Sequence, residues 1–283
     1  MKAGFELHIY ARTKAKVEDV ISEGAIFHES IRECVSECDA VITIVGFPQD
    51  VEEVYFDEGN ILDCASKGAY LIDMTTTSPQ IAEKIYAEGT KRGFHVLDAP
   101  VTGGDTGAKA GTLSILVGGD KEDFEVCMPL FEAMGTNINY QGEAGKGQHC
   151  KLANQIMIAG TLSGVCEALT YAKEQGLDLD VVMRSVSTGA AGSKQLDTFG
   201  SKIIAGDYAP GFFMKHFIKD MKLALIEANR KGLSLDVLSM VLANYEELEA
   251  EGYGELGTQA LIRFYDEEHR YMEDEEEPEQ AEE

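Results

Sequence analysis

The sequence has little positive charge: its 283 residues carry 24 Lys and Arg against 50 Asp and Glu, a formal net charge of −26. A nucleic-acid backbone would be repelled by such a protein, so this balance argues against a nucleic-acid partner. The chain also lacks an unbroken apolar run long enough to cross a bilayer, and we expect no membrane partner. Neither a signal peptide nor an Arg-rich transit segment is visible at the amino end, which favours a cytoplasmic localisation.

The cysteines and histidines lack the spacing of a metal site. The six cysteines include one Cys-x-x-x-Cys pair, Cys34 and Cys38, and the six histidines are scattered along the chain. Protein metal sites need clustered ligands, so we predict that the protein holds no metal. We expect the cysteines to be reduced and partly buried thiols, as in a cytosolic protein.

The hydrophobic pattern changes its period once, which predicts two domains. The chain is 44% hydrophobic, enough for two packed cores. In residues 1–143, short apolar runs alternate with helical stretches, as in a doubly wound parallel α/β sheet. Residues 144–267 have helical periodicity throughout and predict an all-α domain. Residues 268–283 are rich in glutamate and predict a disordered, solubilising tail, with a partner-binding tail as the alternative.

The same patterns predict individual elements. The expected strands are Glu6 to Tyr10, Ala40 to Val45, Tyr70 to Met74, Gly93 to Leu97, Leu113 to Val117 and Asn137 to Tyr140. The expected helices of the second domain are Gln148 to Gln175, Asp180 to Ser187, Lys194 to Ile204, Phe217 to Lys231, Ser234 to Glu251, and Thr258 to Glu268, the last capped by Thr258.

A lysine stands among apolar residues at the start of the second domain. Lys151 follows the entry Gly145-Lys146-Gly147, and Asn154 and Gln155 come three and four residues later. On a helix this spacing places an ammonium and two carboxamides on one face. Lysines are rarely buried unless they are paired or functional, which makes Lys151 a candidate catalytic residue. The alternative is a lysine whose stem covers the core while its ammonium reaches water.

Two other segments offer groups that bind anions. Thr102, Gly103 and Gly104 follow a predicted strand with a hydroxyl and unobstructed backbone N–H groups, which can hold a carboxylate or a phosphate. An ordinary turn is the alternative, since glycine is common in loops. Lys219 and Asp220 open another apolar helix, where the alternative is a solvated charge pair.

In their order along the chain, these segments resemble the β-hydroxyacid dehydrogenase family, which includes 3-hydroxyisobutyrate dehydrogenase and tartronate semialdehyde (2-hydroxy-3-oxopropionate) reductase. Each signature is weak alone, but the ordered set is specific and extends over nearly the whole chain. The resemblance implies a Rossmann-type doubly wound sheet followed by an all-α substrate and oligomerisation domain, and a homodimer or homotetramer. The matching signatures are residues 73–79, 98–104, 111–114 with 117–119, 151–155 and 219–220.

One family feature is absent. Family members begin with a strand, a Gly-x-Gly-x-x-Gly turn and a helix, whereas here residues 1–5 resemble the end of that helix and residues 6–10 the second strand. The turn that would hold the cofactor pyrophosphate is therefore missing, and with it the central first strand of the sheet. Either the natural protein is longer than this sequence, or the chain is a relict that no longer binds cofactor. The retained downstream motifs favour the first account.

The resemblance implies hydride transfer between NAD(P) and a small β-hydroxy acid or its semialdehyde. Lys151 is the expected general acid/base, because a proton must reach or leave the substrate oxygen as hydride moves. Residues 102–104 are expected to hold the substrate carboxylate. Asn154 or Gln155 would orient the substrate oxygen. Some relatives carry asparagine four places after the lysine, where this chain has Gln155, so both carboxamides stay candidates.

The cofactor contacts carried over from the family point to NADP. Arg12 and Thr13 follow the second strand, where an NAD enzyme usually has a carboxylate for the ribose 2′-hydroxyl. A guanidinium there suits the 2′-phosphate of NADP, and the alternative is an arginine that merely begins a solvated helix. The other contacts that the resemblance implies are Val45, Gly46, Gln49, Thr76 and Lys219.

Two alternatives to a small-acid dehydrogenase stay open. A non-catalytic relict or scaffold protein would keep the helical domain without binding cofactor. A 6-phosphogluconate dehydrogenase-like enzyme would carry His-Asn where Asn154 and Gln155 stand, and it would need a cation cluster that we do not find. The sequence itself does not name the substrate.

Overall fold

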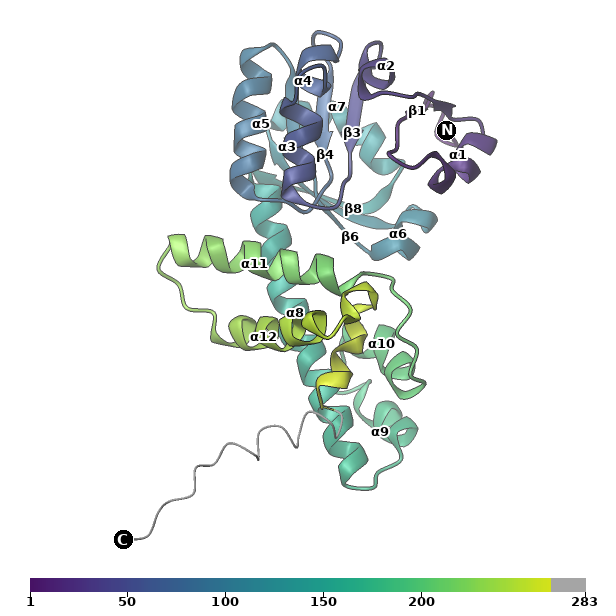
Figure 1. Cartoon of the computed structure of the whole chain (residues 1–283), viewed down its shortest axis with the longest axis vertical. Coiled ribbons are helices and arrows are strands. Elements are labelled where there is room, and N and C mark those ends of the chain that lie inside the picture. The colour runs from purple at the N-terminus through teal and green to yellow at the C-terminus, as the bar shows by residue number, and fades with distance from the viewer. Residues whose placement is uncertain (266–283) are drawn as a thin grey trace. The chain divides into compact units, whose positions relative to one another are not determined.

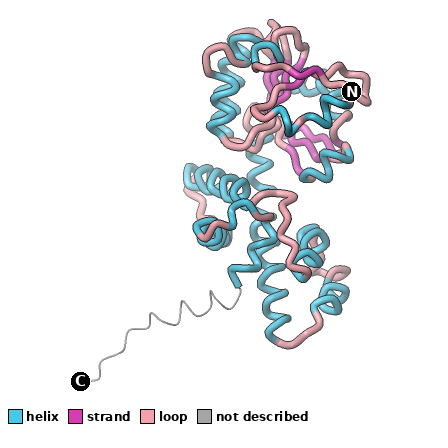
Figure 2. Tube along the Cα trace, turned by 45° about the vertical axis from the view of Figure 1, so that its right-hand side comes forward, coloured by secondary structure: helices cyan, strands magenta, loops and turns pink. Residues whose placement is uncertain are grey.

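The computed structural model describes residues 1–265, which form two compact units. Contacts divide the chain between Leu152 and Ala153, inside a long helix, whereas the sequence places the boundary before that helix, between residues 143 and 144. Figure 2 shows the strands in the first unit, while residues 153–265 form helices joined by loops, with one isolated bridge between Phe213 and Gly257. The predicted acidic tail, residues 268–283, lies outside the described residues.

The first unit contains a six-stranded mixed sheet with the strand order β3-β4-β5-β7-β6, and β8 also pairs with β7. β3, β4 and β5 are parallel, and β7 runs antiparallel to β5 and β6. The sequence predicts a parallel sheet; the chain reverses here because the short connection through β6 and α6 returns it alongside β5. The strands are β3 (Ala40–Thr43), β4 (Tyr70–Asp73), β5 (His95–Asp98), β6 (Val101–Thr102), β7 (Leu113–Gly119) and β8 (Gly135–Gly142).

A second, two-stranded parallel sheet is formed by β1 (His8–Ile9) and β2 (Ile26–Phe27). Among the described residues, β3 pairs with β4 alone, and no strand joins β1 to β3. The strands of the first unit therefore lie in two separate sheets. Residues 1–5 form a turn around Gly4, whose φ is 90°, and not the helix end that the sequence predicts.

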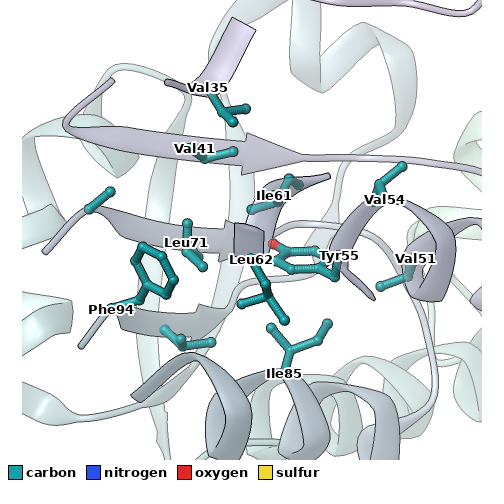
Figure 3. Close-up of a cluster of buried hydrophobic side chains, with 12 residues drawn as sticks. Val35, Val41, Val51, Val54, Tyr55, Ile61, Leu62, Leu71, Ile85 and Phe94 are labelled. Atoms are coloured by element: carbon teal, nitrogen blue, oxygen red, sulfur yellow. The ribbon is translucent and has the colours of Figure 1, made fainter. Parts of the chain in front are cut away.

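Helices cover both faces of the larger sheet (Figure 1). Leu71 of β4 packs into a cluster with α3, α4 and α5, while its neighbour Ile72 faces the opposite way into a cluster with α7. Successive side chains of a strand point to opposite faces, so a run of apolar residues serves both cores. Figure 3 shows the first cluster around Tyr55 of α3. The helices of this unit are α1 (Glu18–Ser22), α2 (Ile31–Val35), α3 (Pro48–Phe56), α4 (Ile61–Cys64), α5 (Pro79–Lys91), α6 (Gly104–Ala110) and α7 (Lys121–Glu132), with a 3-10 turn at Lys14–Lys16.

The second unit is built on α8 (Lys146–Glu174), which begins in the first unit, and its predicted helices are found within a few residues of their expected bounds. The last one differs: Thr258–Tyr265 is a 3-10 helix that contains Thr258, not an α-helix capped by it. Its first turn is fixed from outside, because the Thr258 carbonyl accepts a hydrogen bond from the Tyr245 hydroxyl at 2.8 Å. The remaining helices are α9 (Leu179–Val186), α10 (Lys194–Ile204), α11 (Met214–Arg230), α12 (Asp236–Ala250) and the 3-10 turn Tyr253–Glu255.

Helix α8 is the one helix of residues 1–265 that is long and apolar enough, by length and composition, to cross a membrane. In the structure 44% of its most apolar window is buried inside the protein, and Ala159, Leu162 and Cys166 are inaccessible to solvent. The core helix of a globular protein has the same composition, so this helix alone does not indicate a membrane span.

Candidate active site

The start of α8 is held at the carboxyl ends of β4 and β5. Asp98 ends β5, and its Oδ1 and Oδ2 accept hydrogen bonds from the backbone N–H groups of Gly145 at 2.7 Å and Gln148 at 2.9 Å. The Gln148 amide donates to the Thr75 carbonyl at 2.8 Å and accepts from the Thr77 N–H at 3.0 Å. The first N–H groups of a helix have no partner within it, so Asp98 supplies acceptors that α8 itself lacks.

Sequence reasoning assigned no role to Asp98 or Gln148. The signal was available: an aspartate closes a predicted strand, and a glutamine lies one turn before Lys151. What the sequence could not show is that residues 98 and 148, far apart in the chain, meet at one edge of the sheet.

Burial raises the pKa of two neighbouring carboxyl groups at this edge. Asp73 and Asp98 are in register on β4 and β5 and are 2% and 4% exposed. The pKa of Asp98 is raised to about 6, because burial outweighs the backbone N–H bonds that favour its charged form. The pKa of Asp73 is also raised to about 6 by burial, against hydrogen bonds from Thr75 and Thr43.

Lys151 follows one turn later on α8 and is 7% exposed. Its neighbour Leu152 is 3% exposed, so one face of the helix is buried here, while Ala153 on another face is exposed. Little of the Lys151 side chain is left to reach water, which disfavours the solvated-lysine alternative. A buried amine is a candidate to exchange a proton with a bound substrate.

Thr102, Gly103 and Gly104 form the turn between β6 and α6. Gly103 and Gly104 have φ angles of 131° and 64°, which residues with a side chain rarely adopt. Thr102 is half-buried and both glycines are exposed at the start of α6. Anion binding by these three residues stays a prediction.

Three of the predicted cofactor residues lie at the carboxyl edge of the larger sheet. Val45 and Gly46 follow β3, and Thr76 follows β4; all three are half-buried. The Val45 N–H donates to the Thr75 hydroxyl at 3.0 Å, which joins the two loops. Doubly wound sheets bind their ligands at this edge. Gln49 is exposed on the first turn of α3.

Arg12 and Thr13 are exposed just after β1. The Arg12 guanidinium pairs with Asp50 at 2.8 Å and with Glu53 at 3.2 Å, both on α3, and these carboxylates raise the pKa of the arginine. A 2′-phosphate would have to take the place of one of these partners. Because 57% of the Arg12 side chain is exposed, the guanidinium is accessible for such an exchange.

The second unit contains a buried chain of polar contacts. The Asn154 amide donates to the Gln155 carbonyl oxygen at 2.8 Å, and the Gln155 amide donates to Asp220 of α11 at 2.6 Å. Asp220 also pairs with Lys219 at 3.0 Å. Gln155 and Asp220 are each 1% exposed, whereas Asn154 is half-buried. Both ends of the Gln155 amide are therefore engaged, and its bond to Asp220 joins α8 to α11.

The described residues offer several parts of a dinucleotide site but not its glycine turn. The sequence has Gly-x-Gly-x-x-Gly spacing at residues 252–257, which follow α12 and not a strand, so they lack the context in which such a turn binds pyrophosphate. Val45, Gly46 and Thr76 lie at the sheet edge where doubly wound folds bind dinucleotides, and Arg12 carries an exposed guanidinium. Among residues 1–265, no group of three or more His, Cys, Asp or Glu side chains could hold a metal ion.

Comparison with known proteins gives consistent matches over the whole described chain. A model of the NAD binding domain of 6-phosphogluconate dehydrogenase matches residues 1–142, and one described as the NAD-binding region of NADP-dependent 3-hydroxyisobutyrate dehydrogenase matches residues 145–265. The chain is 47% identical to the uncharacterized oxidoreductase YkwC of Bacillus subtilis, over 93% of this chain and 91% of that protein. It is 35% identical to 2-hydroxy-3-oxopropionate reductase of Escherichia coli, over 93% and 89%.

The fold also matches solved structures. The crystal structure of 3-hydroxyisobutyrate dehydrogenase from Salmonella typhimurium superposes with a TM-score of 0.86 at 25% identity, covering 93% of this chain and 92% of that one. The mixed sheet and the helical unit described above are thus a known architecture.

Proposed function

The chain belongs to the β-hydroxyacid dehydrogenase family of NAD(P)-dependent oxidoreductases, and from that membership we propose that it transfers hydride between NADP(H) and a small β-hydroxy acid or its semialdehyde. The names of similar proteins support a substrate of the 3-hydroxyisobutyrate or tartronate semialdehyde type. When bound, the nicotinamide supplies or accepts the hydride. The protein must then bind the acid, orient its oxygen and move one proton.

The observation that carries the proposal is the buried Lys151, one turn into a helix whose start is fixed at the carboxyl edge of the sheet. That edge is where ligands bind in doubly wound folds, and a proton donor must lie within hydrogen-bond reach of the reacting oxygen. Lys151 as general acid would protonate the carbonyl oxygen of a semialdehyde during reduction. As general base it would take the hydroxyl proton during oxidation.

Substrate orientation is assigned to Thr102, Gly103, Gly104 and Asn154. The threonine-diglycine turn presents a hydroxyl and N–H groups that suit a carboxylate. Of the two carboxamides, Asn154 is the better candidate to orient the substrate oxygen, because the Gln155 amide is engaged at both ends and buried. We therefore assign Gln155 a positioning role within the second unit.

NADP is favoured over NAD by the side chains that follow β1. Arg12 supplies an exposed guanidinium, Thr13 adds a hydroxyl, and neither residue is the carboxylate that would accept from an unphosphorylated ribose. The pairing of Arg12 with Asp50 and Glu53 predicts a modest preference, since the phosphate competes with two carboxylates already in place.

A combined titration and turnover experiment tests this function. Binding of NADPH and of NADH is measured first, followed by oxidation of the better-bound cofactor with 3-carbon and 4-carbon β-semialdehyde acids. We expect tighter binding of NADPH. Lys151→Ala should lower kcat by about 100- to 10,000-fold and leave NADPH binding within about twofold, because the lysine acts on the proton.

Lys146→Ala is the matched control, because Lys146 lies on the first turn of the same helix but is exposed. It should keep the wild-type kcat. Full activity in Lys151→Ala would refute the assignment of that residue as the acid/base.

One observation favours a second candidate function, a non-catalytic binding or scaffold protein. Residues 1–265 contain no Gly-x-Gly-x-x-Gly turn after a strand, and such a turn usually holds the pyrophosphate. The same titration is therefore repeated on a version with a strand, Gly-x-Gly-x-x-Gly turn and helix fused ahead of Met1. If neither version binds NADPH or NADH, the scaffold function replaces the enzymatic one.

A further inference from the structure

Asp98 and Gln148 connect the sheet to the first turn of α8 through four hydrogen bonds. Asp98 reaches the backbone of that turn, at Gly145 and Gln148. The Gln148 side chain returns to the loop that follows β4, at Thr75 and Thr77. Gln148 has no exposed surface, so water does not compete for its amide. Two of these bonds come from the end of β5 and two from the loop after β4, so two neighbouring strands fix the helix start.

Close packing leaves this helix start almost no freedom to move. A Cβ atom built on Gly118 of β7 would lie 2.6 Å from Asp98 Oδ1, and one built on Gly147 of α8 would lie 2.7 Å from Asp98 Oδ2. The same Gly147 Cβ would collide with the Leu116 carbonyl oxygen at 2.3 Å. The helix backbone thus rests directly on β5 and β7, where even a methyl group would force the elements apart.

We propose that Asp98 and Gln148 are positioning residues for Lys151: they fix the first turn of α8, and that turn fixes where the lysine nitrogen lies. The inference rests on the proposed function of Lys151. Lys151 follows Gln148 by three residues on the same helix, so a displacement of this turn is carried to the lysine with no flexible link between them. A shift of about 1 Å at a proton-transfer group is enough to cost roughly 100-fold in rate.

Asparagine is the informative replacement for Asp98, since it has the same shape. A carboxylate accepts at both oxygens, as the bonds to Gly145 and Gln148 require. Asparagine would place an NH2 group against one of these N–H donors, and one end of the turn would be released. The fold should survive the loss of one such hydrogen bond, with a lower melting temperature.

The experiment compares Asp98→Asn with Asp123→Asn in whichever form of the full chain turns over. Asp123 is a second buried aspartate of the first unit, 7% exposed and bonded to His95 at 2.7 Å, away from α8. We expect Asp98→Asn to lower kcat by about 10- to 100-fold with the KM for NADPH within about twofold. Asp123→Asn should lower the melting temperature comparably and leave kcat unchanged.

Dependence on Lys151 is tested with the double variant Lys151→Ala/Asp98→Asn. If Asp98 acts through the lysine, it should not lower the residual rate of Lys151→Ala any further, although it still lowers the melting temperature. A readout without turnover is the labelling rate of each lysine by an amine-reactive reagent, followed by mass spectrometry. Labelling of Lys151 should rise at least tenfold in Asp98→Asn and stay at the wild-type rate in Asp123→Asn, with Lys146 unchanged in both.

The outcomes separate this inference from the proposed function. Normal kcat and unchanged Lys151 labelling in Asp98→Asn, or an undiminished effect in the Lys151→Ala background, would overturn the positioning role alone. Full activity in Lys151→Ala would overturn the proposed function and this inference with it. If Asp98→Asn does not fold, the same kcat and labelling measurements are made on Gln148→Glu. This variant keeps the acceptor for the Thr77 N–H and loses the donor to the Thr75 carbonyl.

Discussion

At the scale of single residues, two aspartates end neighbouring parallel strands with their carboxyl groups buried. Asp73 and Asp98 face each other in register, and burial raises the pKa of each to about 6. Asp73 accepts hydrogen bonds from the Thr43 hydroxyl at 2.9 Å and the Thr75 N–H at 3.1 Å, both through Oδ1. Its Oδ2 is buried without a hydrogen-bond partner among the described residues. Such a group is easier to keep in the fold when it is protonated.

The pH dependence of stability tests this account through Asp73→Asn. Because the folded pKa lies near 6 and the unfolded one near 3.8, the folded state binds more protons in that window. Asp73 should therefore lower the free energy of unfolding as pH rises from about 4 to about 6, by roughly 3 kcal/mol at most. Asparagine keeps the Oδ1 acceptor and cannot ionise, so its stability relative to wild type should rise across the window.

Urea unfolding at several pH values between 4 and 7 measures this difference. The test is how the difference in free energy of unfolding between variant and wild type changes with pH. Its absolute value is not used, because it also contains the cost of burying an NH2 group in the variant. Parallel curves for wild type and Asp73→Asn would show that this carboxyl group does not titrate as the structure indicates.

The carboxamides of Asn154 and Gln155 show which part of the candidate site could be predicted from the sequence. Their spacing predicts that Lys151, Asn154 and Gln155 lie on one helix, and α8 contains all three. The choice between Asn154 and Gln155 could not be made from the sequence. It depends on Asp220, which comes from a distant helix to engage the Gln155 amide. Long-range partners of this kind leave no local pattern.

At the scale of secondary structure, the predictable elements are those with a strong apolar pattern of their own. β3, β4, α8 and α10 are found where the sequence predicts them. The 13-residue helix α5 was not predicted, although Pro79 at its start is a usual helix signal, because its apolar residues are few. The antiparallel direction of β7 could not be predicted from its own residues either. Strand direction depends on the path of the connecting segment.

The split between the two sheets predicts unequal local stability. β1 and β2 are two residues long and, within residues 1–265, pair only with each other. β4 is paired on both sides, and its Leu71 and Ile72 have no exposed surface. Isolated two-stranded pairs are marginal in water. Backbone amides of residues 8–9 and 26–28 should therefore exchange hydrogen at least about 100-fold faster than those of residues 70–73.

Hydrogen exchange followed by mass spectrometry of short peptides measures this contrast, and the peptide spanning the buried middle of α8 serves as a slow internal control. The open edge of β3, where Ile42 and Ile44 are 41% and 67% exposed, should give intermediate rates. Equal protection in both sheets would show that the two-stranded sheet is held by more than its own ladder.

At the scale of the whole molecule, the second unit exposes apolar side chains that its own core does not use. Met157 of α8 is 67% exposed, and Val237 and Met240 of α12 are 59% and 52% exposed. A Cβ atom on Gly160 would lie 3.7 Å from Val237, so these residues belong to one face where α8 and α12 meet. Contiguous exposed apolar surface on a protein that is otherwise strongly acidic marks an interaction site. We propose that a second copy of the chain covers this face in a homodimer or homotetramer.

Val237→Glu tests this assembly, with Val126→Glu as its matched control. Val126 lies on α7 of the first unit and is 58% exposed, so both substitutions put a glutamate in place of an equally accessible valine. A two-fold symmetric interface is formed by the same surface of both chains, so the substitution places two glutamates in it. Burying these carboxylates without nearby cations would be costly. Light scattering after size exclusion should give a multiple of 30.8 kDa for wild type and Val126→Glu, and a single chain for Val237→Glu. An unchanged oligomer in Val237→Glu would place the interface elsewhere, and a wild-type monomer would leave this apolar face to a different partner.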